Sequence, residues 1–185
     1  MKKLIPIIES VDENAVRGDA ETIYRDCIML VVKHPGEEKY LYISNKKFGW
    51  NFLVQGGIEE GENMLVSAIR ELVEETGFTD IKSVKKLDFI MDNVYYAAHK
   101  KQNRYAVVYT FYIELNSLTQ KEHEDVGKIK FDTYKNLKDI FGAAFVHHYY
   151  LLGIATGNQK EEVSVDKTRL GENKLVNHMV KYREE

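Results

Sequence analysis

Short apolar runs separated by polar turns predict a series of β-strands in the first two thirds of the chain. The run DCIMLVVK, at residues 26–33, is rich in β-branched residues, and HPGEEK supplies turn-forming residues before the short strand YLYIS. These two strands are expected to form a hairpin. Further strands are predicted at residues 81–92, 93–99 and 104–114, with the polar turn KKQN between the last two.

Two segments have apolar residues at helical rather than alternating spacing. They are residues 64–76 and residues 143–156, the latter reading AAFVHHYYLLGIAT. Helices that interleave with strands are typical of layered α/β domains, so the predicted fold class is α/β with a mixed sheet.

The C-terminal part of the chain has a different composition. After Gly157 the sequence becomes polar, and apolar residues then recur at helical spacing, at Leu175, Val176, Met179 and Val180. We therefore expect a main domain at residues 1–157, with its core at about 26–141, and a tail at 158–185. The tail is predicted to be a polar linker and a helix that docks on the domain or forms a homodimer.

Composition narrows the class of protein. With 185 residues, 44% of them hydrophobic, the chain suits one domain with a substantial core. The net charge of -3 gives no general reason to expect a nucleic acid or a membrane as partner, so any phosphate-binding site must be local. No apolar run is long enough to span a bilayer. The single cysteine, Cys27, lies in an apolar run, which indicates a small core residue and a reducing, cytoplasmic location.

Three carboxylates share one side of the helix predicted at residues 64–76. At about 100° per residue, Glu71, Glu74 and Glu75 fall within one arc, and the opposite side carries Leu65, Ala68, Ile69, Leu72, Val73 and Thr76. Like charges at this spacing destabilise a helix, and only Arg70 is close enough in sequence to offset them. Several carboxylates on one rigid face suit a hard cation such as Mg²⁺ or Mn²⁺.

The loop before this helix is rich in glycine. The sequence QGGIEEGE places Gly56, Gly57 and Gly61 just upstream, where glycine permits tight turns and a close approach of the backbone to a ligand. Gly77 fits the left-handed position that commonly ends a helix. The loop, the helix and its end are therefore expected to form one structural unit.

The spacing of these residues matches a known family motif. Gly56, five residues, Glu62, seven residues, Arg70-Glu71-Leu72, one residue, Glu74-Glu75, one residue and Gly77-Phe78 reproduce the Nudix box, G-x5-E-x7-R-E-U-x-E-E-x-G-U with U apolar, at every specified position. The chain therefore resembles the Nudix (MutT-like) hydrolases. This resemblance implies an α/β/α sandwich and divalent-metal-dependent cleavage of a nucleoside diphosphate linked to another group. The alternative is a Nudix-fold module that senses a nucleotide without cleaving it.

The resemblance also implies roles for the motif residues. Glu71 and Glu75 resemble the principal Mg²⁺ ligands, with Glu74 a further ligand or a candidate base. Arg70 would orient the carboxylates through an ion pair, and Glu62 would brace the loop. The backbone carbonyl of Gln55 corresponds to a frequent metal ligand, although Val54 and Gln55 stand where most relatives have a proline and a further glycine.

A second base is expected outside the motif. In many relatives a glutamate in a later loop accepts the proton of the attacking water, or binds metal. The stretch KEHEDVGKIKF offers Glu122 and Glu124 for this role, and Glu124 is preferred.

Several residues are candidates for contacting a small nucleotide substrate, of nucleoside triphosphate or dinucleoside polyphosphate type. Tyr95 and Tyr96 occupy the region where some relatives carry a nucleotide-stacking tyrosine, and Arg104 ends the basic stretch HKKQNR. Trp50 and Phe52 precede the motif and are expected to line the pocket or the core. His147 and His148 are adjacent, diverge on a helix, and make a poor metal pair.

Overall fold

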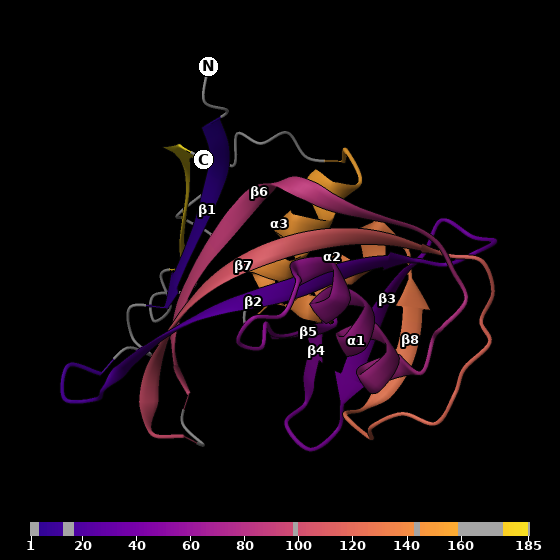
Figure 1. Cartoon of the computed structure of the whole chain (residues 1–185), viewed down its shortest axis with the longest axis horizontal. Helices are drawn as coiled ribbons and strands as arrows, with labels where there is room; N and C mark the ends of the chain where they lie inside the picture. Colours follow the sequence, from indigo (N-terminus) through magenta and orange to yellow (C-terminus); the bar gives the residue numbers. More distant parts are fainter. Residues whose placement is uncertain (1–3, 13–16, 98–99, 143–144, 159–175, 185) are drawn as a thin grey trace.

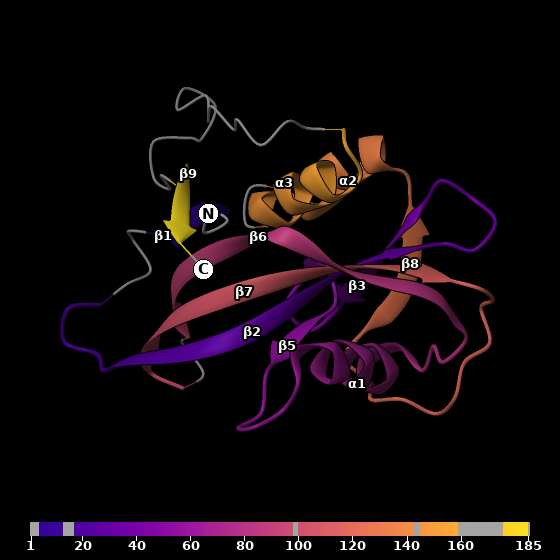
Figure 2. The same cartoon turned by 45° about the horizontal axis from the view of Figure 1, so that its top comes forward.

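The computed structural model of the chain describes residues 4–12, 17–97, 100–142, 145–158 and 176–184. A single mixed β-sheet lies between two layers of helix (Figures 1 and 2). Helix α1 (Met64–Thr76) covers one face, and helices α2 (Tyr134–Phe141) and α3 (Val146–Ala155) cover the other. The predicted α/β/α sandwich with a mixed sheet is confirmed.

The sheet has the strand order β4-β3-β2-β7-β6-β1-β9, with β5 paired to β2 and β8 paired to β3. The strands are β1 (Leu4–Asp12), β2 (Thr22–Lys33), β3 (Tyr40–Asn45), β4 (Trp50–Phe52), β5 (Gln55–Gly57), β6 (Ile81–Ala97), β7 (Gln102–Leu115), β8 (Lys128–Asp132) and β9 (Val176–Glu184). Strand β2 runs parallel to β7, and β1 runs parallel to β6, whereas the other pairs are antiparallel.

The second half of strand β2, residues 28–32, is buried on both faces, which explains its continuous apolar run. Met29 and Val31 point into the core beneath α2 and α3, whereas Ile28, Leu30 and Val32 point into the core beneath α1. All five side chains are inaccessible to solvent. The sheet therefore separates two apolar cores. Strand β2 also pairs with β5, which leads into the loop before α1.

Helix α1 begins and ends at the residues that the sequence predicts. The Asn63 side chain caps its first turn by accepting a hydrogen bond from the Leu65 N–H (2.9 Å), and Gly77 follows its last residue in the left-handed conformation. The buried face carries Ser67, Ala68, Leu72 and Thr76. Leu65 and Ile69, which were expected on the apolar face, are 45% and 37% exposed, because the sheet covers only part of the helix.

We expect Gly77→Ala to lower the free energy of unfolding by at least about 2 kcal/mol. Gly77 has φ of 71°, and left-handed strain costs about 1–2 kcal/mol for a residue with a Cβ. A Cβ there would also lie 2.3 Å from the backbone oxygen of Lys121, so overpacking adds about 1–3 kcal/mol. Equilibrium urea unfolding measures the loss.

Gly61→Ala is the matched control for this substitution. Gly61 has φ of 76°, but a Cβ there would meet nothing within 4 Å. The control should therefore lose only the strain of about 1–2 kcal/mol. If the two variants lost equal stability, the loop around Lys121 would not pack closely against Gly77.

Some predicted elements differ in extent. The strands predicted at residues 81–92 and 93–99 form one long strand, β6, which has an irregularity in its pairing between Lys86 and Ile90. The helix predicted at residues 143–156 is confirmed as the shorter α3, and α2 precedes it. The short strands β4, β5 and β8, together with β1, were not predicted.

The predicted C-terminal helix is wrong. Residues Val176–Glu184 form strand β9, which pairs antiparallel with β1 at the edge of the sheet. In VNHMVKYRE, Val176, Val180 and Tyr182 fall on one face of a strand, while Val176, Met179 and Val180 have helical spacing. The backbone of β1 supplies the hydrogen-bonding partner that a strand needs. Apart from Asn158, the polar linker predicted after Gly157 lies outside the described residues.

Candidate active site

Arg70 lies at the centre of a group of carboxylates. Its Nε and Nη2 atoms donate to the two carboxylate oxygens of Glu62 at 2.9 and 3.0 Å, and Nη2 also donates to the Gly57 carbonyl at 2.9 Å. Its Nη1 atom donates to Glu71 at 2.8 Å and to Glu74 at 3.0 Å. A planar guanidinium can serve all these acceptors at once, which a lysine ammonium cannot. The arginine thereby orients two of the three helix carboxylates and the glycine loop.

Glu62 joins the glycine loop to α1. Besides its two bonds to Arg70, it accepts a hydrogen bond from the Ser67 hydroxyl at 2.6 Å and from the Glu59 N–H at 3.1 Å. The hydrogen bonds from Arg70 and Ser67 lower the pKa of Glu62 to about 2, so this carboxylate is ionised, and both of its oxygens accept hydrogen bonds. Its position suits a structural brace rather than a proton acceptor.

Gly56 and Gly57 leave room for two side chains to approach the backbone closely. A Cβ on Gly56 would lie 1.9 Å from the carboxyl carbon of Glu71, and a Cβ on Gly57 would lie 1.9 Å from a terminal nitrogen of Arg25. Each would need the facing group to move. The two glycines therefore allow a carboxylate and a guanidinium to rest directly against the backbone of β5.

Gln55 presents its backbone to Glu75. The Leu30 N–H donates to the Val54 carbonyl at 2.9 Å, so the next pair along, Met29 and Gln55, is not hydrogen-bonded within the β2–β5 ladder. The N–H and C=O of Gln55 consequently point away from β2, and the N–H donates to the Glu75 carboxylate. The carbonyl is free of the β2–β5 ladder, as a metal ligand would have to be.

Glu75 is the most perturbed carboxylate of the group. Burial raises its pKa to about 8, and the neighbouring Glu71, Glu124 and Glu74 add to the effect. Among the described residues, its Oε2 atom is buried without a hydrogen-bond partner. Burial also raises the pKa of Glu71. A buried acidic oxygen with no donor, beside a second carboxylate, is the setting in which a divalent cation binds.

The carboxylates of Glu71, Glu74 and Glu75 do not all point toward one metal-binding position. In the described part of the chain, no three acidic, histidine or cysteine side chains are arranged to hold a metal ion. Arg70 binds one oxygen of Glu71 and one of Glu74, and the second oxygen of each carboxylate is not bonded to it. The oxygen donors present, including the Gln55 carbonyl, are nevertheless the type that Mg²⁺ and Mn²⁺ prefer.

The loop after β7 brings Glu124 to the helix. The Glu124 N–H donates to the backbone carbonyl of Glu74 at 2.8 Å, and the Lys121 N–H donates to that of Gly77 at the same distance. Glu122 and Glu124 line a small hollow of about 410 Å³ beside Glu74. Glu124 is close enough to Glu75 to raise the pKa of that carboxyl.

Tyr95 and Arg104 lie together on the face covered by α2 and α3. They are direct partners in the β6–β7 ladder. Burial raises the pKa of Tyr95, and the nearby guanidiniums of Arg25 and Arg104 oppose this effect. Arg25 also hydrogen-bonds the half-buried thiol of Cys27, whose pKa is raised by burial.

Arg25 is a candidate that the sequence analysis missed. It rests against Gly57, on whose other side Arg70 holds the carbonyl, so it lies next to the carboxylate group. Among the described residues, neither Arg25 nor Arg104 forms an ion pair with a carboxylate. A guanidinium without a carboxylate partner is a candidate for binding an anion, and Arg25 places one against the glycine loop. The only sequence signal was an arginine just before a buried strand.

The remaining substrate candidates lie elsewhere. Tyr96 is adjacent to Tyr95 on a strand and so points to the opposite face, where the Arg17 guanidinium lies 4.2 Å from its ring centre. Trp50 and Phe52 lie on β4, which β3, β2 and β7 separate from β6. Phe52 packs against the α1 core, whereas Trp50 is 48% exposed. The five predicted contacts therefore form three separate groups, which are Tyr95 with Arg104, Tyr96 alone, and Trp50 with Phe52.

His148 holds the strand that leads to the glycine loop. It is fully buried, and its Nδ1 atom accepts a hydrogen bond from the Leu53 N–H at 3.0 Å. Burial lowers the pKa of His148 well below its usual value, so the ring is neutral. In the same way the Asn51 side chain donates to the Ile140 carbonyl at 3.0 Å. Helices α2 and α3 thus fix β4 from the side opposite α1.

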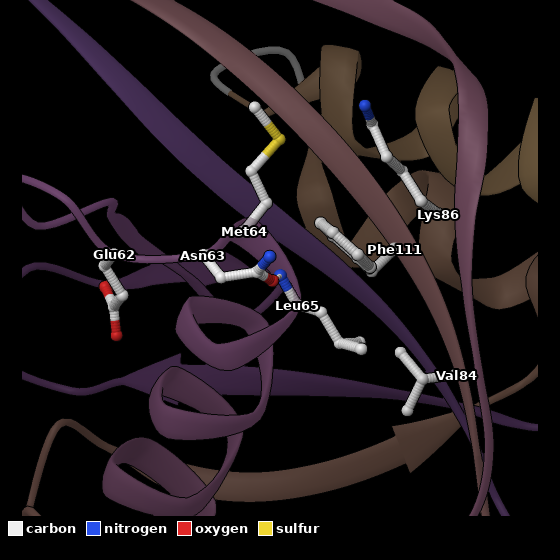
Figure 3. Close-up of a pocket in the computed structure, with 7 residues that line it drawn as sticks. All are labelled: Glu62, Asn63, Met64, Leu65, Val84, Lys86 and Phe111. Carbon is white, nitrogen blue, oxygen red and sulfur yellow. Dashed lines mark hydrogen bonds between the residues drawn. The ribbon is translucent and has the colours of Figure 1, made fainter.

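A second and larger hollow, of about 550 Å³, lies at the N-terminal end of α1 (Figure 3). It is lined by Glu62, Asn63, Met64, Leu65, Val84, Lys86 and Phe111. None of the three helix carboxylates lines it, and the Glu62 carboxylate points away from the other side chains. The hollow therefore meets the candidate active site only at Glu62 and does not contain the three helix carboxylates.

The fold and site define a class of protein: an α/β/α sandwich that presents acidic helix residues beside a glycine loop. The family model for the NUDIX domain matches residues 23–152. The chain belongs to the Nudix family, and it is a pyrophosphohydrolase. The prediction of a Nudix pyrophosphohydrolase is confirmed.

Known relatives and structures support the family assignment. The chain is 32% identical over 132 residues to an RNA pyrophosphohydrolase of Bartonella quintana, covering 60% of this chain and 75% of that protein. The dihydroneopterin triphosphate pyrophosphohydrolase of E. coli has a similar fold, with a TM-score of 0.57 at 14% identity, over 71% of this chain and 98% of that one. The Ap4A hydrolase of C. elegans is also similar in fold, with a TM-score of 0.54 at 18% identity, over 73% and 99%.

No described helix is both long enough and apolar enough to cross a bilayer.

Proposed function

We propose that the protein is a divalent-metal-dependent hydrolase that cleaves the phosphoanhydride bonds of a nucleoside 5′-polyphosphate, and that its preferred substrate is the 5′-triphosphate end of an RNA. The buried, unpartnered Oε2 of Glu75 carries the proposal, because it lies among other carboxylates in a protein with a net negative charge. A bound cation would supply the missing partner and would let Glu75 ionise. Mg²⁺ is the proposed metal, with Mn²⁺ as the alternative.

The residues that would hold the metal are Glu71, Glu75 and the Gln55 carbonyl, with Glu74 as a further ligand. When bound, the metal supplies charge neutralisation for the phosphates and lowers the pKa of water. Arg70 orients Glu71 and Glu74 and holds the Gly57 carbonyl. Glu124, which adjoins Glu75, is the proposed acceptor of the proton of the attacking water, with Glu74 as the second candidate.

Arg25 and Arg104 are proposed to bind phosphates that are not attacked. Their guanidiniums lack carboxylate partners among the described residues, and Arg25 rests against the glycine loop. A guanidinium can bind two phosphate oxygens at once. Tyr95, which lies beside both arginines, would then contact the nucleotide.

The choice of RNA rests on the relatives. The Bartonella proteins are named RNA pyrophosphohydrolases, and they are similar over 55–69% of this chain. The likeness to the Ap4A hydrolase is a likeness of fold alone. This proposal replaces the expectation, drawn from net charge, that no nucleic acid is bound, and it leaves nucleoside triphosphates and dinucleoside polyphosphates as the competing substrates.

Product analysis by mass spectrometry tests the proposal. The panel is a 5′-triphosphorylated RNA oligonucleotide, a nucleoside triphosphate and diadenosine tetraphosphate, each with Mg²⁺ and with a chelator. We expect kcat/KM for the RNA to exceed that for the other two by about tenfold or more, since further nucleotides add contacts. A preference for diadenosine tetraphosphate would overturn the substrate assignment, and no cleavage of any of the three would overturn the proposed function.

A further inference from the structure

The hairpin between β3 and β4 carries an exposed pair of stacked aromatic rings. Phe48 and Trp50 are 53% and 48% exposed, their ring centres are 4.8 Å apart, and their planes differ by 24°. The Lys47 ammonium lies 5.3 Å from the centre of the Phe48 ring. Large aromatic side chains of a folded domain are mostly buried, so two exposed rings at one tip need an explanation.

Lysines gather beside these rings. Strand β8 begins next to the hairpin, because Lys128 is the ladder partner of Ser44 while Trp50 is the ladder partner of the next residue, Asn45. The close approach of Lys128 lowers the pKa of Lys46, and Lys130 adds to this effect. Among the described residues, none of these lysines forms an ion pair with a carboxylate. We call the group the basic–aromatic surface, which consists of Lys46, Lys47, Phe48, Trp50, Lys128 and Lys130.

This surface adjoins the candidate active site. The loop that carries Glu124 continues directly into β8, and the Asn45 side chain holds it by donating to the Val126 carbonyl at 2.8 Å. Glu124 and Lys128 are four residues apart, which limits their Cα atoms to about 14 Å. Figure 1 shows the hairpin, the start of β8 and the C-terminal end of α1 at the same end of the molecule. The charge therefore changes from acidic to basic over a short distance.

Unpaired lysines beside stacked, exposed rings have the chemistry that binds a single-stranded nucleic acid. The lysines suit backbone phosphates, and the rings offer a face on which unpaired bases stack without regard to sequence. We propose that the basic–aromatic surface binds the single-stranded RNA that follows the 5′ end held in the active site. The inference rests on the proposed function for its choice of RNA, and it adds a binding surface beyond the first nucleotide.

The test uses unphosphorylated RNA, so that binding is measured without cleavage. Trp50 is the only tryptophan, so its fluorescence reports directly on this surface. Titration with a short 5′-hydroxyl single-stranded RNA should quench it, because a base stacked on the indole changes its environment. An RNA duplex of equal length should quench it less, since its bases are not free to stack.

The charge contribution is tested with Lys46→Gln/Lys128→Gln. Anisotropy of a labelled 5′-hydroxyl RNA should show Kd raised about tenfold at low salt. The slope of log K against log salt should fall by about 1.4, at about 0.7 per lysine neutralised. The matched control is Lys85→Gln/Lys86→Gln, which removes the same charge on β6 and should bind RNA like wild type. Trp50→Leu should weaken binding without changing the salt slope.

Catalysis gives the second readout. With a 5′-triphosphorylated RNA, the Lys46/Lys128 variant should have a raised KM and an unchanged kcat, whereas its kcat/KM for a nucleoside triphosphate should equal that of wild type. Equal RNA affinity and salt slope in wild type and this variant would overturn the inference. So would Trp50 quenching by anionic lipid vesicles but not by RNA.

The two proposals can fail separately. If the protein binds 5′-hydroxyl RNA through these lysines but cleaves no member of the substrate panel, the surface is supported and the proposed function is overturned. If it cleaves 5′-triphosphorylated RNA and the lysine variant is indistinguishable from wild type, the function is supported and the surface is overturned.

Discussion

Replacing Glu75 with glutamine is expected to remove two properties of the wild-type protein together: its loss of stability as pH rises from about 4.5 to about 8 without metal, and its stabilisation by Mg²⁺. Burial and Glu71 raise the pKa of Glu75 to about 8, above its usual value of 4.5. Between these two values the folded protein keeps a proton that the unfolded chain has released. The free energy of unfolding therefore falls as pH rises through this window, by about 1.4 kcal/mol per pH unit at most.

The glutamine variant has no carboxylate to ionise, so the fall should be absent from it. Without metal, wild type should be less stable than Glu75→Gln by a few kcal/mol at about pH 9, and the difference should be much smaller near pH 5. Mg²⁺ should raise the melting temperature of wild type and should leave that of the variant unchanged. Thermal unfolding with chelator and with excess Mg²⁺, each at both pH values, compares wild type with the variant under four conditions.

Glu60→Gln serves as the control for the loss of one negative charge. Glu60 lies exposed in the loop before α1. The control should follow wild type in both its pH dependence and its response to Mg²⁺. If Glu75→Gln behaved like Glu60→Gln, the pKa of Glu75 would not be raised in the metal-free protein, and Glu75 would not be a metal ligand.

Arg70→Ala is expected to destabilise the protein by about 2–4 kcal/mol and to reduce activity on the order of 100-fold. The substitution leaves the Gly57 carbonyl and the carboxylates of Glu62 and Glu71 without their shared donor. Removing one partner of a partly buried group of ion pairs is costly because the other charges remain. Urea unfolding measures the stability. The Mg²⁺ concentration for half-maximal activity should rise, because the carboxylates are no longer held in place.

Arg70→Lys separates charge from geometry. A lysine keeps the positive charge but has one nitrogen, so it cannot bind Glu62, Glu71, Glu74 and Gly57 together. We expect stability between those of wild type and Arg70→Ala, and activity close to that of Arg70→Ala. Lys135→Ala, an exposed position on α2, controls for loss of a surface cation. Full activity in Arg70→Lys would show that charge alone suffices.

The parts of the site that follow from local sequence could be predicted. Helix α1 has both of its end signals next to a period of apolar residues, and its bounds in the structure match the predicted ones. Once the helix is placed, the arc shared by Glu71, Glu74 and Glu75 follows from its geometry. Glu124 was found from its resemblance to a position in relatives, and the structure places it against the Glu74 backbone.

The parts of the site that depend on contacts between distant segments of the chain could not be predicted from the sequence. Arg25 gains its importance only because β5 pairs with β2 and places Gly57 against its guanidinium. Strands β4 and β5 have three residues each, too few to show a period. The two orientations of Tyr95 and Tyr96 follow from strand alternation, but which face meets the substrate depends on the packing of α2 and α3.

The C-terminal residues show how one pattern can support two structures. Val176 and Val180 are compatible with one side of a helix and with one face of a strand. These residues form a strand because they pair with β1, which lies near the other end of the chain. The expected homodimer and cytoplasmic location stay predictions.

The central claim is that the carboxylates around Glu75 bind the divalent metal needed to cleave a nucleoside 5′-polyphosphate. The most direct test follows cleavage of a 5′-triphosphorylated RNA by mass spectrometry over a Mg²⁺ titration, in wild type and in Glu75→Gln. We predict cleavage in wild type that saturates with Mg²⁺ and stops with chelator, and a loss in the variant on the order of 1,000-fold, since the metal supplies several kcal/mol of charge stabilisation. Equal rates in the two proteins, or an unchanged wild-type rate in chelator, would contradict the claim.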